Sequence, residues 1–159
     1  MKMNTCIAIS IALLFLLVSG GCEDNRNYTT GEGRDRETRL HRAAWNGDLE
    51  KVKKIVATGT DVDCLDGLGA TPLVRAVNPL ARGDSINIEL VEFLISKGAD
   101  VNSDAVVHAA AIGGNVEVVK LLVSKGANVN VKNEDGKTPL DIARERRNVK
   151  VVEYLSGIR

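Results

Sequence analysis

Thr38-Arg-Leu-His-Arg-Ala-Ala-Trp-Asn-Gly47 and Ala105-Val-Val-His-Ala-Ala-Ala-Ile-Gly-Gly114 are two copies of one sequence unit. Thr71-Pro-Leu73 and Thr138-Pro-Leu140 open two further copies. The distances from Thr38 to Thr71 and from Ala105 to Thr138 are both 33 residues. A helical unit of this length cannot bury its apolar face alone, so the units are predicted to stack into one elongated body.

The sequence of each unit predicts two helices. Its apolar residues recur every three or four positions in two segments, which is the spacing of one buried helix face. Pairs such as Gly47-Asp48 and Gly114-Asn115 separate the segments. Glycine ends the first helix there, and Asp or Asn caps the second. In the first unit the apolar residues with this spacing are Leu40, Ala43, Ala44, Val52, Ile55 and Val56.

These motifs resemble the ankyrin repeat over residues 36 to 159. The Thr-Pro-Leu motifs, Gly98-Ala-Asp-Val-Asn102 and Glu117-Val-Val-Lys-Leu-Leu122 all stand at the family's positions. The resemblance implies an all-α repeat solenoid of about four ankyrin repeats, each with paired helices followed by a projecting β-hairpin loop. It also implies a non-catalytic role in binding other proteins. The repeats are predicted at about 36–65, 66–102, 103–132 and 133–159.

Two irregularities interrupt the repeat. Leu73 to Glu89 is 16 residues, whereas Leu40 to Glu50 is 10, so the second unit has a six-residue insertion between its helices. Glu89 to Val107 is 18 residues, whereas Glu50 to Leu73 is 23. We therefore predict a longer helix connection in the second unit and a stubby or absent hairpin after it.

The first and last units are predicted to be caps. Lys51 and Lys54 in the first unit, and Arg144 and Ser156 in the last, stand where the third unit has apolar residues. Polar residues at otherwise buried positions are what terminal repeats need, because these repeats have a neighbour on one side only.

The ankyrin register places partner-contacting side chains on the concave helix face and the hairpin tips. We interpret Trp45, the only tryptophan, as a binding anchor rather than a core residue, because large aromatic residues dominate binding energy. The predicted set mixes apolar residues with both charges, as protein interfaces do; the alternative is that several members are only solvated. The predicted contact residues are Trp45, Asn46, Gly67, Leu68, Ala70, Asn78, Ile112, Glu134, Asp135, Lys137, Glu145 and Arg146.

Catalysis and cofactor binding are not predicted. His41 and His108 share one register position two units apart and have no clustered carboxylate or cysteine partners. The resemblance implies that each imidazole fixes loop backbone between units. We predict no catalytic residue, metal, cofactor or small-molecule substrate. Arg82-Gly-Asp-Ser85 matches a tetrapeptide that integrins recognise, but such a short match arises readily by chance, and host adhesion is the outlying alternative.

Residues 1–21 have the composition of a secretory signal peptide, with Lys2 before an apolar run from Cys6 to Val18. The run is shorter than the roughly 20 residues that a membrane span needs. Ser19-Gly-Gly-Cys22 resembles the lipobox of bacterial lipoproteins, in which the chain is cut before the cysteine and the thiol receives diacylglycerol. Serine departs from that pattern, which more often has Leu, Val or Ile. Ordinary signal cleavage with a free Cys22, or an uncleaved anchor, are the alternatives.

The segment 22–35 is predicted to be the lipidated Cys22 and a flexible tether, because it has almost no apolar residue that could order it. The chain has 21 basic and 21 acidic side chains. No basic field exists for phosphates, so nucleic-acid binding is not predicted. With Cys6 removed and Cys22 lipidated, Cys64 would be a lone, half-buried thiol.

The leading hypothesis is a protein-binding module tethered by an N-terminal lipid to a bacterial envelope membrane, facing the periplasm or the exterior. A soluble periplasmic or secreted protein is the alternative location. The function alternatives are an inhibitor or immunity protein against a toxin or enzyme, and a structural scaffold of envelope proteins.

Overall fold

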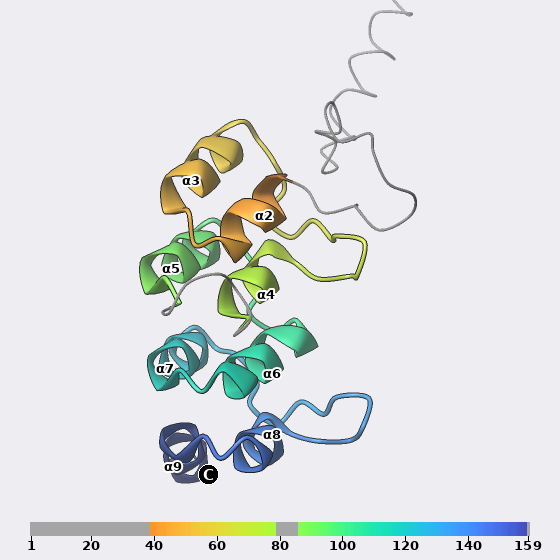
Figure 1. Ribbon diagram of the computed structural model, residues 1–159, viewed down its shortest axis with the longest axis vertical. Coiled ribbons are helices and arrows are strands. Elements are labelled where there is room, and N and C mark those ends of the chain that lie inside the picture. Colours follow the sequence, from red (N-terminus) through yellow and green to blue (C-terminus); the bar gives the residue numbers. More distant parts are fainter. Residues whose placement is uncertain (1–38, 79–85, 159) are drawn as a thin grey trace, which may run out of the picture.

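The computed structural model describes residues 39–78 and 86–158 (Figure 1). The predicted signal, the tether with Cys22, and the Arg82-Gly-Asp-Ser85 motif lie outside these residues. Within them, every regular element is an α-helix, and the helices follow one another in four pairs. The pairs are α2 (Arg39–Trp45) with α3 (Leu49–Ala57), α4 (Pro72–Val77) with α5 (Ile88–Ser96), α6 (Asp104–Gly113) with α7 (Val116–Ser124), and α8 (Pro139–Glu145) with α9 (Val149–Gly157). The predicted all-α repeat solenoid is confirmed.

The helices form two layers (Figure 1). In the inner layer α2 packs on α4, α4 on α6, and α6 on α8; in the outer layer α3, α5, α7 and α9 pack in the same order. The core lies between the layers, where Leu73, Leu94 and Leu122 are fully buried. Fully burying such a side chain contributes roughly 1.5–3 kcal/mol, so stacking supplies the stability that a single pair lacks. Among the described helices, none is both long and apolar enough to cross a membrane.

The repeated Thr-Pro-Leu motif begins inner helices. Thr71 is the N-cap of α4, and its hydroxyl accepts a hydrogen bond from the Val74 N–H at 3.3 Å. Thr138 caps α8 in the same way and forms a reciprocal capping box with Asp141. The proline that follows each threonine occupies the first helical turn, where no backbone N–H is needed. The motif therefore sets where each of these helices starts.

The predicted insertion is confirmed. The connection from α4 to α5 runs over residues 78–87, whereas residues 46–48 join α2 to α3 and residues 146–148 join α8 to α9. The second unit nevertheless keeps its stacking, because Asn87 caps α5 and also reaches the preceding unit. Its Nδ2 donates to the Gly47 carbonyl oxygen at 3.1 Å.

The predicted loss of one hairpin is also confirmed. Residues 97–103 join α5 to α6, whereas residues 58–71 and 125–138 make the equivalent connections before α4 and α8. The threonine that caps α4 and α8 is replaced by Ala105, which has no capping oxygen, and α6 begins earlier with Ser103 as its N-cap residue. Figure 1 shows two loops projecting from the inner layer and none beside α6.

We name the two projecting loops the N-terminal finger (residues 58–71) and the C-terminal finger (residues 125–138). The β-hairpin that the resemblance implies is present only as a tight turn, since no strand is assigned in the described part of the chain. Two backbone bonds close each finger. Asp66 N–H donates to Ala70 O and Gly69 N–H to Asp66 O, each at 3.0 Å; Asn133 N–H donates to Lys137 O at 3.0 Å and Gly136 N–H to Asn133 O at 2.8 Å. Both bonds belong to the turn itself and do not extend into a ladder, and side chains add further support.

Candidate protein-binding surface

Asp66 supports the N-terminal finger from inside. Its side chain is 1% exposed, and Oδ1 accepts hydrogen bonds from the backbone N–H groups of Leu68 at 2.8 Å and Ala70 at 3.0 Å. The other oxygen, Oδ2, accepts from Arg75 Nε at 2.6 Å and lies 2.5 Å from Arg75 Nη2. One buried carboxylate thus fixes the finger tip and ties it to α4.

The Asp66 carboxylate is held in its charged form. Burial by itself raises the pKa of Asp66, but hydrogen bonds from the Ala70 N–H, the Arg75 guanidinium and the Leu68 N–H outweigh it. The net result is a pKa below the ordinary value for aspartate. The ion pair with Arg75 therefore persists throughout the neutral pH range.

Trp45 connects to the same network. The Arg75 guanidinium lies over the Trp45 ring, 5.7 Å from its centroid, and the indole is half-buried at the end of α2. A cation over an aromatic face is stabilising. Trp45, Arg75 and Asp66 therefore link α2, α4 and the N-terminal finger. Sequence reasoning missed Arg75 and Asp66, although Asp66 and Asn133 both stand five residues before a capping threonine.

The tip of the N-terminal finger exposes two large apolar side chains. Leu65 is 61% and Leu68 is 83% exposed. The predicted contact residues Gly67 and Leu68 are on this tip, while Ala70 is half-buried at its base. Leu65 was not among the predicted contact residues. Its exposure next to the buried Asp66 depends on the tertiary structure. Rigidly held, exposed leucines are a ready contact for an apolar surface.

Both histidines bind loop backbone, as the resemblance implied. His41 is fully buried, and its Nε2 donates to the carbonyl oxygens of Ala70 at 2.8 Å and Cys64 at 3.1 Å. His108 Nε2 is 3.1 Å from the Lys137 carbonyl oxygen, in the C-terminal finger. Each imidazole thus joins an inner helix to the finger that follows its unit, and the structural interpretation of these residues is confirmed.

Because of His41, we expect the free energy of unfolding to fall as the pH is lowered below about 6.5. Burial is the largest influence on the pKa of His41 and lowers it; the hydrogen bond to Ala70 raises it but does not compensate. The unfolded chain takes up this proton near the ordinary pKa of about 6.5, so folding is favoured fully above that pH and loses up to about 1.4 kcal/mol per pH unit below it.

Urea unfolding at pH 7.5 and 5.5 measures this slope. His41→Gln is expected to be less stable at pH 7.5 but to lose less free energy of unfolding on acidification than the wild type. Equal losses in the two proteins would show that His41 does not titrate with unfolding.

The prediction that Cys64 is a lone thiol is wrong, because its sulfur is in a disulfide. The other two cysteines of the chain, Cys6 and Cys22, lie outside the described residues. Cys64 is buried in the N-terminal finger rather than half-buried, and its carbonyl oxygen accepts a hydrogen bond from His41.

The C-terminal finger is polar where the N-terminal finger is apolar. Asn133 Oδ1 accepts hydrogen bonds from the backbone N–H groups of Asp135 at 3.1 Å and Lys137 at 2.9 Å. Lys137 Nζ lies 2.8 Å from Glu145 Oε1 on α8, and its hydrogen bond to Glu145 raises the pKa of Lys137. Two predicted contact residues, Lys137 and Glu145, thus bind each other, while Glu134 and Asp135 remain exposed.

The remaining predicted contact residues lie apart from one another. Asn46 and Arg146 are exposed beyond the ends of α2 and α8, and Asn78 is half-buried where the long connection of the second unit begins. Ile112 is half-buried on α6, and its carbonyl oxygen accepts from Asn148 Nδ2 at 3.2 Å. The predicted residues therefore extend along the whole inner layer, and their contact with a partner stays a prediction.

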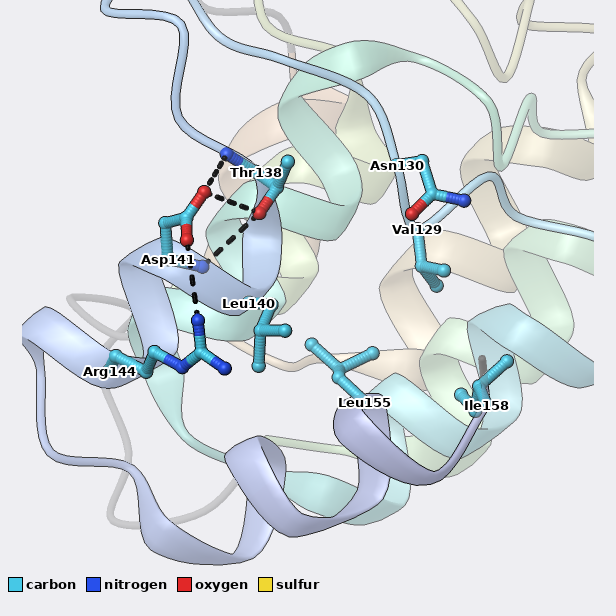
Figure 2. A pocket seen from close by; sticks show the side chains of 8 residues that line it. All are labelled: Val129, Asn130, Thr138, Leu140, Asp141, Arg144, Leu155 and Ile158. Atoms are coloured by element: carbon cyan, nitrogen blue, oxygen red, sulfur yellow. Dashed lines mark hydrogen bonds and ion pairs between the residues drawn. The ribbon is translucent and has the colours of Figure 1, made fainter.

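A hollow of about 340 Å³ lies in the last unit (Figure 2). Its polar members bind one another: Thr138 and Asp141 form the capping box, and Asp141 Oδ1 lies 3.7 Å from Arg144 Nη1. Apart from these, it is lined by Val129, Asn130, Leu140, Leu155 and Ile158. None of the predicted contact residues lines this hollow. In the described part of the chain no group of three or more His, Cys, Asp or Glu residues could hold a metal ion.

Comparison with known proteins agrees with this architecture. A family model described as "Ankyrin repeats (3 copies)" matches residues 40–104 and 80–159. The chain is similar to the B-cell lymphoma 3 protein homolog of Mus musculus, with 33% identity over 92% of this chain and 31% of that protein. It is also similar to the probable E3 ubiquitin-protein ligase XBOS34 of Oryza sativa, with 34% identity over 80% of this chain and 25% of that protein.

A third relative is the E3 ubiquitin-protein ligase Ufd4 of Drosophila melanogaster, with 42% identity over 62% of this chain and 4% of that protein. The chain therefore spans at most about a third of the length of these relatives. What they share with it is the helix-pair repeat. Since the family model covers nearly all of the stacked helices, the chain belongs to the ankyrin-repeat family, whose repeats generally bind other proteins.

Proposed function

We propose that this chain is a non-catalytic protein-binding module held at a bacterial envelope membrane by a lipid on Cys22. The observation that supports binding most directly is the N-terminal finger, where Leu68 is 83% exposed on a loop that Asp66 holds from inside. Burying a leucine against a partner contributes roughly 1.5–3 kcal/mol. Because the loop is already ordered, little conformational entropy is lost on binding.

Trp45 extends this surface into the inner layer. The indole is half-buried beneath the Arg75 guanidinium, so its position does not depend on a partner. Aromatic residues and arginine are the commonest energetic centres of protein interfaces. We therefore propose that a partner contacts the finger tip and the Trp45–Arg75 pair together.

Replacing Leu68 by serine is expected to weaken partner binding about tenfold, because it removes most of one buried apolar contact. The fold should persist, since the side chain touches little of the protein. Ile158→Ser is the control: Ile158 is also an exposed apolar residue, 39% accessible, but it lies at the C-terminal end of α9 in the outer layer. The measurement is recovery of the partner by the full chain from envelope extracts. Equal recovery with both variants would contradict the proposed surface.

Cys22→Ser is expected to abolish fatty-acid labelling and release the protein from the membrane fraction. Cys64→Ser, in the finger, should keep both properties. The disulfide of Cys64 competes with this attachment, because a Cys22 sulfur bonded to glycerol cannot also form a disulfide. Alkylation before and after reduction separates the two states. A Cys22 thiol that becomes reactive only after reduction, without fatty-acid label, would overturn the lipid attachment.

Two versions of this function predict different consequences of deleting the gene. An inhibitor or immunity protein predicts sensitivity to one toxin or unrestrained activity of one enzyme. A scaffold predicts that several envelope proteins lose their location. The short tether and the small rigid body support the inhibitor version, because such a body can block one site on one partner.

A further inference from the structure

The turn between α8 and α9 places an arginine where glycine is favoured. Arg147 has a φ of 59°, and the corresponding residues of the first and third units are Gly47 at 69° and Gly114 at 70°. The left-handed backbone region is costly for a residue with a side chain and open to glycine. Folding alone therefore favours glycine at position 147. A strained residue of this kind is a reason to look for a function.

The turn is rigid despite this cost. The Arg147 N–H donates to the Arg144 carbonyl oxygen at 3.0 Å, and the Asn148 N–H donates to Ala143 O at 2.9 Å. Asn148 Nδ2 reaches into the preceding unit and donates to Ala111 O at 2.7 Å. These bonds fix the backbone that bears Arg147 before any partner arrives, so binding does not have to order the turn.

We name the exposed side chains of Arg146, Arg147 and Lys150 the basic cluster. All three side chains are exposed, and within the described residues none of them takes part in an ion pair. The acidic groups of the neighbouring helix are already engaged, because Glu145 pairs with Lys137 and Asp141 with Arg144. The chain as a whole has no net charge, so this field is local.

We propose that the basic cluster binds an acidic segment of the protein partner. This inference rests on the proposed function and specifies the chemistry of that partner. Arginine suits this role because its planar guanidinium binds carboxylates through two parallel hydrogen bonds. A fixed positive field at one end of the surface also orients the partner as it approaches.

The partner then meets an apolar contact in the first two units and a basic contact in the last unit. The N-terminal finger and Trp45 are apolar, whereas the basic cluster lies three inner helices away, beyond α8. Consecutive inner helices lie roughly 8–10 Å apart, so α2 and α8 are separated by roughly 25–30 Å along the stack. A bridging segment therefore needs more than roughly eight extended residues, because the cluster also lies at the opposite end of its inner helix from the fingers. A segment with an apolar residue at one end and acidic residues at the other fits this arrangement.

An acidic protein segment is favoured over anionic lipid by the place of the cluster in the stack. The proposed lipid anchor and its tether precede α2, in the first unit, whereas the cluster belongs to the last unit. A body held at the membrane by its first unit can leave its last unit free for a partner.

The test uses the full chain and a fluorescein-labelled dodecapeptide of alternating glutamate and glycine. The wild type is expected to bind this peptide at low ionic strength and to weaken as salt screens the charges. Arg146→Gln with Lys150→Gln should raise Kd about tenfold. Lys54→Gln with Lys125→Gln removes the same charge from exposed lysines elsewhere and should change Kd less than twofold.

Arg147→Gly separates binding from folding. It should raise Kd about fivefold and also raise Tm by a few degrees, because the strain is relieved while a charge is lost. A lower Tm, or an unchanged Kd, would overturn the proposal. Cluster-dependent binding to phosphatidylglycerol vesicles by Cys22→Ser protein, without peptide binding, would overturn it in favour of a membrane contact.

The same experiments distinguish this inference from the proposed function. If Leu68→Ser loses the partner while the cluster variants bind partner and peptide as the wild type does, only the acidic-segment inference fails. If the peptide requires the cluster but Leu68→Ser keeps the partner, the proposed finger surface fails instead.

Discussion

Asp66→Ala is expected to lower the free energy of unfolding by about 3–5 kcal/mol, the range for breaking one partner of a buried ion pair. The Arg75 guanidinium would lose its buried counter-ion, and the N–H groups of Leu68 and Ala70 would lose their acceptor. Trp45 is the only tryptophan of the chain and lies beside Arg75. Its fluorescence therefore reports the local change, and urea unfolding measures the loss.

Asp66→Asn is the control that separates the two roles of this carboxylate. An asparagine keeps an oxygen for the finger N–H groups, as Asn133 does in the C-terminal finger, but removes the charge that pairs with Arg75. We expect a loss smaller than that of the alanine variant, about 1–3 kcal/mol. If alanine and asparagine cost the same, the finger bonds contribute nothing to stability.

Gly114→Ala is expected to lower the free energy of unfolding by about 2–4 kcal/mol, through two additive effects. Gly114 has a φ of 70°, which an alanine adopts only at a cost. A Cβ at this position would also lie 2.6 Å from Asn148 Oδ1. The asparagine would have to move, and its bonds to the carbonyl oxygens of Ala111 and Ile112 would be lost. Thermal and urea unfolding both measure the effect.

Gly126→Ala provides a matched comparison. Gly126 has a similar φ of 88°, but a Cβ there meets no atom within 4 Å. Its loss should be only the backbone cost of about 1–2 kcal/mol. Combining Gly114→Ala with Asn148→Ala should cost less than the sum of the single changes, because the clash and the lost bonds share one partner. Equal losses for the two glycines would show that Asn148 does not hold the third and fourth units together.

Much of the fold could be predicted by counting residues. The 33-residue spacing predicts the stack, and the Thr-Pro-Leu motif predicts two inner helix starts because hydroxyl capping and proline act locally. The insertion in the second unit and the lost finger before α6 follow from the same register. The β-hairpin implied by the resemblance was reduced to a turn, because two backbone bonds with a side-chain support replace a ladder.

The candidate site was less predictable. Trp45, Leu68 and Lys137 could be placed on the predicted surface by their register alone. Their partners could not: Arg75 over Trp45 and Glu145 on Lys137 join residues of different helices and fingers. The left-handed conformation of Arg147 was also missed, although its alignment with Gly47 and Gly114 is a signal that could have revealed it.

By itself, the sequence determined the architecture of this protein, because helix periodicity, capping and turn formation act over a few residues and recur in every unit. Only the tertiary structure decided which polar groups are satisfied and which remain available. Asp66 is buried and paired with Arg75. In contrast, Arg146, Arg147 and Lys150 are exposed and form no ion pair within the described residues. That division depends on how neighbouring units stack, since each unit supplies the acceptors and counter-ions of the next.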